Sequence, residues 1–156
     1  MTAATFADYA TQADARQSIA DAVLRHTQAL CEALTQNYID YAIRRHQLIL
    51  DTFTGKERAY HQFSITELKA GKCDYSFIIE SGRKYYKLIE VIDHGPNRMG
   101  PSRSVHCFVD KNTGEVYKSA NWKSPAKGVR YSLLDDNSRE LCYTNCDWAG
   151  SYLYLK

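Results

Sequence analysis

The stretch that decides the fold is residues 20–48, which reads ADAVLRHTQALCEALTQNYIDYAIRRHQL. Residues spaced alternately three and four apart form a seam along it, the pattern of a helix with one packing face. The members of the seam are Ala20, Val23, Thr27, Leu30, Leu34, Asn37, Tyr41, Arg44 and Leu48. Residues 1–54 contain no Gly and no Pro, the two residues that most often interrupt a helix. We therefore predict that the first third of the chain is helical.

The length of this segment leaves two arrangements open. One helix over residues 6–52 would be about 70 Å long at about 1.5 Å per residue, whereas a compact domain of this size has a radius of gyration of roughly 15 Å. A break near residues 35–37 would give a helical hairpin within the chain. An unbroken helix would project and pair with another copy. We favour a homo-oligomer formed through the N-terminal helix.

The rest of the chain changes to short segments with strand patterns and turn residues. Ser81-Gly82 and residues 110–114 are turns between such segments, and they predict an antiparallel meander. We expect a helix at 64–71, strands at 75–80, 83–93, 104–110, 115–119 and 129–133, a helix at 135–147 with Leu141 on its apolar side, and a strand at 152–155. The predicted class is α+β: a long N-terminal helix or helical hairpin, then a small antiparallel sheet with a short C-terminal helix. Residues 1–54 form an oligomerisation segment and residues 55–156 an α+β domain.

Composition excludes several classes of protein. The 156 residues hold 20 Lys+Arg and 18 Asp+Glu, a net charge of +2, which is too little for a typical duplex-DNA binder. No apolar run is long enough to span a membrane, and the first residues do not resemble a secretory signal. The five cysteines are an odd number in a chain large enough to build a core, so we expect reduced thiols in a cytosolic protein.

The charge is unevenly distributed along the chain. Residues 83–130 hold ten basic and four acidic residues, a net charge of +6, so the remainder carries −4. Two irregular loops in this region, at 94–104 and 121–128, combine Gly or Pro with Arg, Lys, Ser and one Trp. Exposed amides, guanidinium groups and hydroxyls suit a phosphate, and a Trp ring stacks on a base. The candidate ligand-binding residues are Asn97, Arg98, Ser102, Arg103, Ser104, His106, Trp122, Lys123, Lys127 and Arg130.

No catalytic, metal or cofactor motif is recognisable. His106 and Cys107 are neighbours on a predicted strand, so their side chains point to opposite faces. Cys142 and Cys146 share a helix face, but no second pair of residues has the spacing of a metal site. We therefore expect a protein that is not an enzyme and uses no metal and no cofactor.

Three segments resemble a family of small tailed-phage proteins. They are SVHCFVDKNTGEVYK at 104–118, WKSPAKGVRY at 122–131 and DWAGSYLY at 147–154, and the resemblance covers roughly residues 80–156. It implies a phage-encoded protein acting in the cytoplasm of an infected bacterium. In its general features, though not in a sequence motif, the chain also resembles phage proteins of the Sequestin and Lockin kind. These proteins sequester the cyclic-nucleotide signals of Thoeris and CBASS immunity. These proteins are small, oligomeric and non-catalytic, with basic and aromatic loops.

The leading hypothesis is that the chain sequesters a small phosphorylated nucleotide, of the cyclic ADP-ribose or cyclic dinucleotide type, and so inhibits anti-phage signalling. Arg98 and Arg103 would clamp phosphates while Trp122 stacks on the base. One alternative is a phage protein that binds single-stranded nucleic acid through the same loops. Another is a structural or virion-associated protein whose sheet is a scaffold.

Overall fold

The computed structural model describes residues 6–52, 55, 57–96 and 100–155. From α1 to α3 its helices and strands follow the predicted order, and the α+β class is confirmed. They are α1 (Phe6–Thr52), α2 (Arg58–Lys69), β1 (Tyr75–Ser81), β2 (Tyr85–Ile92), β3 (Ser102–Asp110), β4 (Glu115–Lys118), β5 (Tyr131–Ser132), α3 (Asp136–Asn145) and a short 3-10 helix η1 (Ser151–Leu153).

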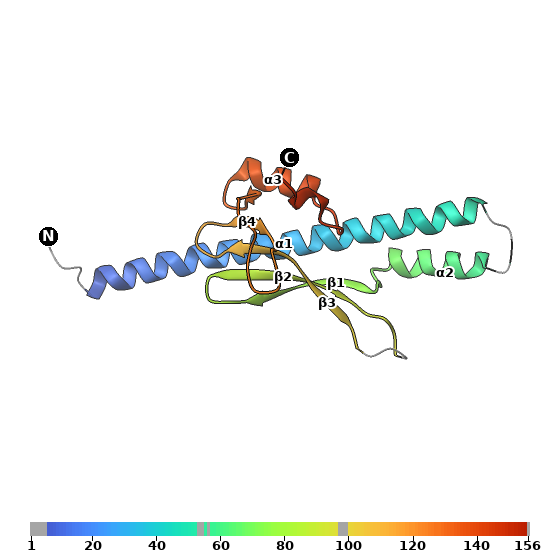
Figure 1. Cartoon of the computed structure of the whole chain (residues 1–156), viewed down its shortest axis with the longest axis horizontal. Helices are drawn as coiled ribbons and strands as arrows, with labels where there is room; N and C mark the ends of the chain where they lie inside the picture. The colour runs from blue at the N-terminus through green and yellow to red at the C-terminus, as the bar shows by residue number, and fades with distance from the viewer. Residues whose placement is uncertain (1–5, 53–54, 56, 97–99, 156) are drawn as a thin grey trace.

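Helix α1 is unbroken over its 47 residues, which at about 1.5 Å per residue is about 70 Å (Figure 1). The break considered near residues 35–37 does not occur. A hairpin forms instead between the end of α1 and α2, which run side by side, and His46 Nδ1 lies 2.8 Å from His61 Nδ1 across it. The predicted helix start at Ser64 is wrong, because residues 58–63 contain no helix breaker and extend α2 by six residues toward the N-terminus.

The five strands form one antiparallel sheet in the order β1-β2-β3-β4-β5, so the predicted meander is confirmed. The turn between β3 and β4 is held by Asp110, whose carboxylate accepts hydrogen bonds from the amides of Asn112 and Thr113 at 2.8 and 3.2 Å. Gly114 ends that turn at φ 72°, where a Cβ would lie 2.9 Å from Leu134 Cγ. The β2–β3 ladder shifts register between Leu88 and Ile89, which inserts one extra residue into β3.

The seam of α1 packs on the sheet of the same chain. Val23, Leu30 and Leu34 are fully buried and belong to one hydrophobic core with Leu88 and Val109. These seam residues are therefore already covered, and residues on either side of the predicted boundary at 54 share one core. At its C-terminal end the seam runs past the sheet, and Leu48 is 68% exposed. Oligomerisation through α1 stays a prediction.

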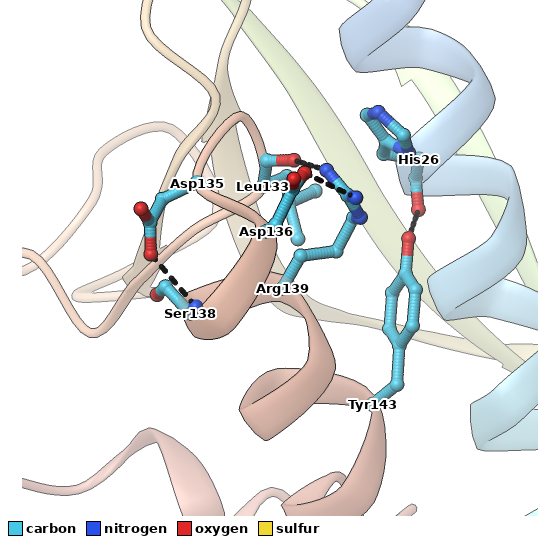
Figure 2. Close-up of polar contacts among 7 residues, drawn as sticks. All are labelled: His26, Leu133, Asp135, Asp136, Ser138, Arg139 and Tyr143. Atoms are coloured by element: carbon cyan, nitrogen blue, oxygen red, sulfur yellow. Dashed lines mark hydrogen bonds and ion pairs between the residues drawn. The ribbon is translucent and has the colours of Figure 1, made fainter.

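Helix α3 is held by side-chain hydrogen bonds to two backbone oxygens, one on α1 and one in the segment between β5 and α3. The Tyr143 hydroxyl donates to the His26 carbonyl at 2.9 Å, and Arg139 donates to the Leu133 carbonyl at 2.9 Å (Figure 2). The prediction that Leu141 lies on the packed side is wrong, since its side chain is 54% exposed. The face of α3 that meets the core carries the fully buried Cys142 instead.

The C-terminal segment is not the predicted strand at 152–155. Gly150 adopts a left-handed conformation with φ 84°, and residues 151–153 form η1. The Asp147 carboxylate accepts hydrogen bonds from the amides of Ser151 and Tyr152, both at 3.2 Å. These bonds turn the backbone into a helical turn and remove it from the sheet.

Aromatic side chains connect this C-terminal segment to α1 and β1. Tyr38 stacks on Tyr75 with ring centroids 3.9 Å apart, and the Trp148 ring lies edge-on 5.5 Å from each of them. Asn37, one of the polar members of the seam, accepts a hydrogen bond from the Trp148 amide at 3.0 Å. The side-chain oxygen of Asn37 is thus paired with a backbone donor of the same chain.

All five cysteines lie in the described part of the chain, and each is unpaired. Burial raises the pKa of Cys31 and of Cys142 to about 12, so both thiols stay protonated near neutral pH. None of the helices that the structure describes combines the length and apolar character that crossing a membrane requires.

Candidate ligand-binding site

The strands present two faces of opposite character. The inner face packs on α1 and carries Tyr86, Leu88, Cys107, Val109 and Val116, all buried. Since successive side chains of a strand point to opposite faces, their neighbours make up the outer face. The strand register agrees with this assignment of the faces, because Lys87 lies opposite Phe108, and Phe108 lies opposite Tyr117.

The outer face carries aromatic rings with a lysine among them. The Tyr85 ring meets Phe108 edge-on at 5.6 Å and Tyr117 at 6.3 Å. Lys87 Nζ lies 5.7 Å from the Phe108 ring centroid and 5.0 Å from that of Trp122, which reaches the face from the β4–β5 loop. The Lys87 ammonium therefore lies within cation–π distance of two rings.

A hollow of about 180 Å³ opens on this face next to the rings. Tyr85 and Phe108 form its aromatic part. Among the described residues, four cations and one carboxylate line it: Arg83, Lys84, Lys87, Lys123 and Glu80. The net charge of +3 around a small aromatic hollow attracts anions.

The loop carrying Trp122 and Lys123 is tied at its base and at its tip. Ser119 and Pro125 form an isolated bridge at the base. At the tip, the Asn121 side-chain oxygen accepts hydrogen bonds from the amides of Lys123 and Ser124, both at 2.9 Å. An Asn that bonds backbone amides two and three residues ahead fixes a turn. The turn leaves Trp122 at the tip, 43% exposed and in reach of Lys87.

The predicted residues of the 94–104 loop do not all share this face. Arg103 pairs with Val91, which is four residues beyond Lys87 on β2 and so on the same face. At about 3.3 Å per residue, Arg103 lies about 13 Å further along the face. Asn97 and Arg98 lie outside the described residues.

Three other predicted residues lie on the inner face. Ser104 pairs with Glu90, which lies opposite the buried Phe77, and Ser102 keeps the same alternation. The extra residue of the β3 bulge is His106, which packs its ring 5.4 Å from that of Phe77. The sheet therefore separates these side chains from Trp122.

The two remaining predicted residues belong to the end of the β4–β5 loop. The Arg130 guanidinium donates from Nε to the Leu153 carbonyl at 2.6 Å, and from Nη1 to the carbonyls of Lys127 and Gly128 at 2.6 and 2.5 Å. These bonds tie the loop to the C-terminal segment. Arg130 therefore supports the loop, and its Nε and Nη1 donors are already used by backbone carbonyls. Lys127 is exposed outside the lining of the hollow.

Sequence reasoning therefore brought together Trp122 and Lys123 but missed Tyr85, Lys87 and Phe108. The sequence contains a pattern that predicts two of them, because Tyr85 and Lys87 alternate with Tyr86 and Leu88 along β2. That alternation places a ring and a cation on the face away from the core.

No group of three or more His, Cys, Asp or Glu side chains within the described ranges is arranged to hold a metal ion. The predictions of no metal, no cofactor and no enzymatic activity stay predictions.

Comparison with protein families identifies the family of this chain. The model of a family of unknown function, DUF7717, matches residues 6–155, from the start of α1 to the C-terminal segment. The chain belongs to this family. Neither the curated proteins nor the solved structures contain a match. The match covers both α1 and the sheet, so the helix that packs on the inner face lies within the matched range.

Proposed function

We propose that this DUF7717 protein binds a small phosphorylated nucleotide on the outer face of its sheet, with a phosphate group in the hollow and the base beside it on Trp122. The observation that carries the proposal is the group of four cations, Arg83, Lys84, Lys87 and Lys123, around an aromatic hollow of about 180 Å³. Cations attract phosphates, while an exposed ring offers a base its π-face.

Trp122 and Lys123 have distinct roles in this proposal. The exposed Trp122 ring stacks on the base, with Lys87 on the ring increasing the attraction for a phosphate nearby. Lys123, next in the chain and on the rim of the hollow, contacts the phosphate. The fixed loop limits the ordering that binding requires, which favours affinity.

The resemblance of residues 80–156 to tailed-phage proteins supports a more specific form of the proposal. A phage-encoded protein in the cytoplasm of an infected bacterium would bind a cyclic ADP-ribose-type or cyclic dinucleotide signal. Binding without turnover would withhold the signal from a Thoeris or CBASS effector and so protect the phage. No catalytic residue is needed for that role.

A homo-oligomer formed through α1 is a second part of this proposal. The apolar residues of α1 available to a partner are the seam positions Tyr41 and Leu48 and the neighbouring Ile19, which are 37%, 68% and 40% exposed. Sedimentation velocity tests it: a dimer or larger assembly that dissociates in Leu48→Glu supports it, and a monomer at high concentration contradicts it.

A second candidate function is binding of single-stranded nucleic acid. The position of Arg103 favours it, since this residue lies on the outer face about 13 Å beyond Lys87, too far to share one small ligand and suitable for a further phosphate of a strand.

Calorimetry with cyclic ADP-ribose, cyclic GMP-AMP and a 15-nucleotide oligo-dT, each at 50 and 200 mM salt, separates the two functions. The proposal predicts saturable binding of a cyclic nucleotide with a shallow salt dependence, and a loss of about 1–3 kcal/mol in Trp122→Ala. Lys69→Ala, which removes a cation from α2, is the control and should bind as the parent does. Binding of oligo-dT alone, weakening steeply with salt, supports the second candidate. The absence of heat with every probe contradicts both.

A further inference from the structure

A second cavity lies on the other side of the sheet, between the inner face and the C-terminal segment. Its volume is about 220 Å³. Its lining includes Glu90 on β2, His106 on β3 and Lys118 on β4 together with the hydroxyls of Ser104 and Ser119. Gly150 and Tyr154 close it from the C-terminal side. None of these residues belongs to the hollow proposed above.

Two opposite charges line this cavity without neutralising each other. Among the described residues, the ion pairs within 4.0 Å are Lys72 with Glu67 and Arg139 with Asp136, so neither Glu90 nor Lys118 is in one. Lys118 Nζ lies 3.4 Å from the Ser119 carbonyl oxygen and 4.8 Å from the Tyr154 ring centroid. Both side chains are half-buried, so each has given up part of its hydration without gaining a counter-charge.

The third polar group is a buried imidazole. His106 is 8% exposed, and its Nε2 lies 2.7 Å from the Tyr152 hydroxyl. Burial lowers the pKa of His106 to about 4 and raises that of Tyr152 well above its ordinary value, so both groups are neutral at pH 7. If the Tyr152 hydroxyl donates to Nε2, the single imidazole proton resides on Nδ1.

Nδ1 of this ring lies toward Gly150. The point that a Cβ would occupy at Gly150 is 4.0 Å from His106 Nδ1 and 3.7 Å from Cε1. A residue without a side chain at this position keeps the space next to Nδ1 open. The described residues give Nδ1 no hydrogen bond, so it can donate to a ligand in the cavity.

We propose that this cavity binds a small zwitterion of the free amino acid class. The ligand's ammonium group pairs with the Glu90 carboxylate. Its carboxylate pairs with Lys118 and accepts a hydrogen bond from His106 Nδ1. Only a ligand that carries both charges satisfies the two separated groups at once, and 220 Å³ is below the usual size of a pocket for a drug-sized molecule.

The test is a thermal-shift and calorimetry screen of the twenty proteinogenic amino acids, one at a time at 5 mM, on the full chain. At least one should raise the melting temperature, because a ligand that binds the native state stabilises it. The N-acetyl methylamide of the same amino acid lacks both charges and should give no shift. A panel without any shift overturns the proposal, as does binding of guanosine in place of every amino acid.

Two near-isosteric variants locate the site. Glu90→Gln and Lys118→Met should each weaken binding at least tenfold, while Glu67→Gln, a carboxylate of α2, serves as the matched control and should have no effect. Circular dichroism and denaturation of each variant show whether it is folded. A folded Glu90→Gln that binds as the parent does overturns the proposal. Trp122→Ala should bind the amino acid as the parent does. The amino acid result therefore tests this cavity independently of whether the outer hollow binds nucleotides.

Discussion

The inner and outer faces of the sheet are made from alternate residues of the same strands, yet they meet different surroundings. On β2, Leu88 is fully buried against the core, while Lys87, one residue earlier, lies between the rings of Phe108 and Trp122. The inner face has α1 as its cover. The outer face meets Trp122 of the β4–β5 loop, and a cationic hollow opens on it beside the rings. The difference teaches that the core packed on α1 and the proposed binding site belong to different faces, so substitutions can separate their effects.

The largest expected effect is on the inner face. Leu88→Ala should lower the free energy of unfolding by about 2–5 kcal/mol, because it removes buried methyl groups and leaves a cavity among fully buried neighbours. Urea denaturation measures this loss. Ile78→Ala on the outer face is the control, since Ile78 is already 41% exposed and should cost clearly less. Equal losses at the two positions would contradict the assignment of the faces.

The second effect is a pH dependence from His106. Its pKa is lowered from 6.5 to about 4 by burial, with Asp147 opposing the shift, so the unfolded chain binds the proton more readily than the folded one. Stability should therefore be complete above about pH 6.5 and fall by roughly 3 kcal/mol as pH falls through 4.

Denaturation midpoints of the parent and of His106→Gln, measured from pH 7 to pH 4, test this prediction. The parent should lose more stability than the variant over that range, and the difference isolates His106 from the carboxylates that titrate nearby. Parallel curves would contradict the prediction, because they would mean that the pKa of His106 is the same in the folded and the unfolded chain.

A third effect concerns Arg130, which connects the loop to the C-terminal segment. Arg130→Ala should cost about 1–3 kcal/mol of stability, because three backbone carbonyls lose a charged donor. Arg130→Lys keeps the charge but not the planar fork and should recover only part of the loss. Nucleotide binding by folded Arg130→Lys should be close to that of the parent. A variant of full stability that no longer binds would instead make Arg130 a ligand residue.

The smallest effect is expected at Lys87. Lys87→Met keeps the aliphatic part of the side chain and removes the ammonium group from the two rings, which should lower stability by about 0.5–1 kcal/mol. Lys69→Met on α2 is the matched control. Lys87→Met should also weaken nucleotide binding. An unchanged affinity would show that the rings, and not the cation, make the outer-face site.

How far the sequence predicts this fold depends on the range of the interactions. The helix without breakers, the meander and the Asp110–Gly114 turn follow from local chemistry and were predicted. The continuity of α1 did not follow, because the same seam suits a second helix or a sheet, and the sheet that covers Val23, Leu30 and Leu34 lies far away in sequence. Leu141 is exposed for the same reason, since the core selects which face of a short helix it meets.

The site was less predictable than the fold. Residue counts located the excess positive charge, and Trp122 and Lys123 are indeed neighbours of the hollow. Counting did not show that the Arg130 guanidinium is occupied by backbone carbonyls, or that a bulge places His106 on the inner face. Both outcomes depend on backbone atoms that meet only in the folded chain.

The most direct test of the outer-face site uses Trp122 itself as the reporter. In Trp148→Phe, Trp122 is the single tryptophan, and a base stacked on its exposed ring should quench its fluorescence. We predict saturable quenching by a cyclic ADP-ribose-type or cyclic dinucleotide ligand, with an affinity that matches calorimetry on the parent. Calorimetric binding of the same nucleotide that leaves the Trp122 signal unchanged would contradict the proposed site.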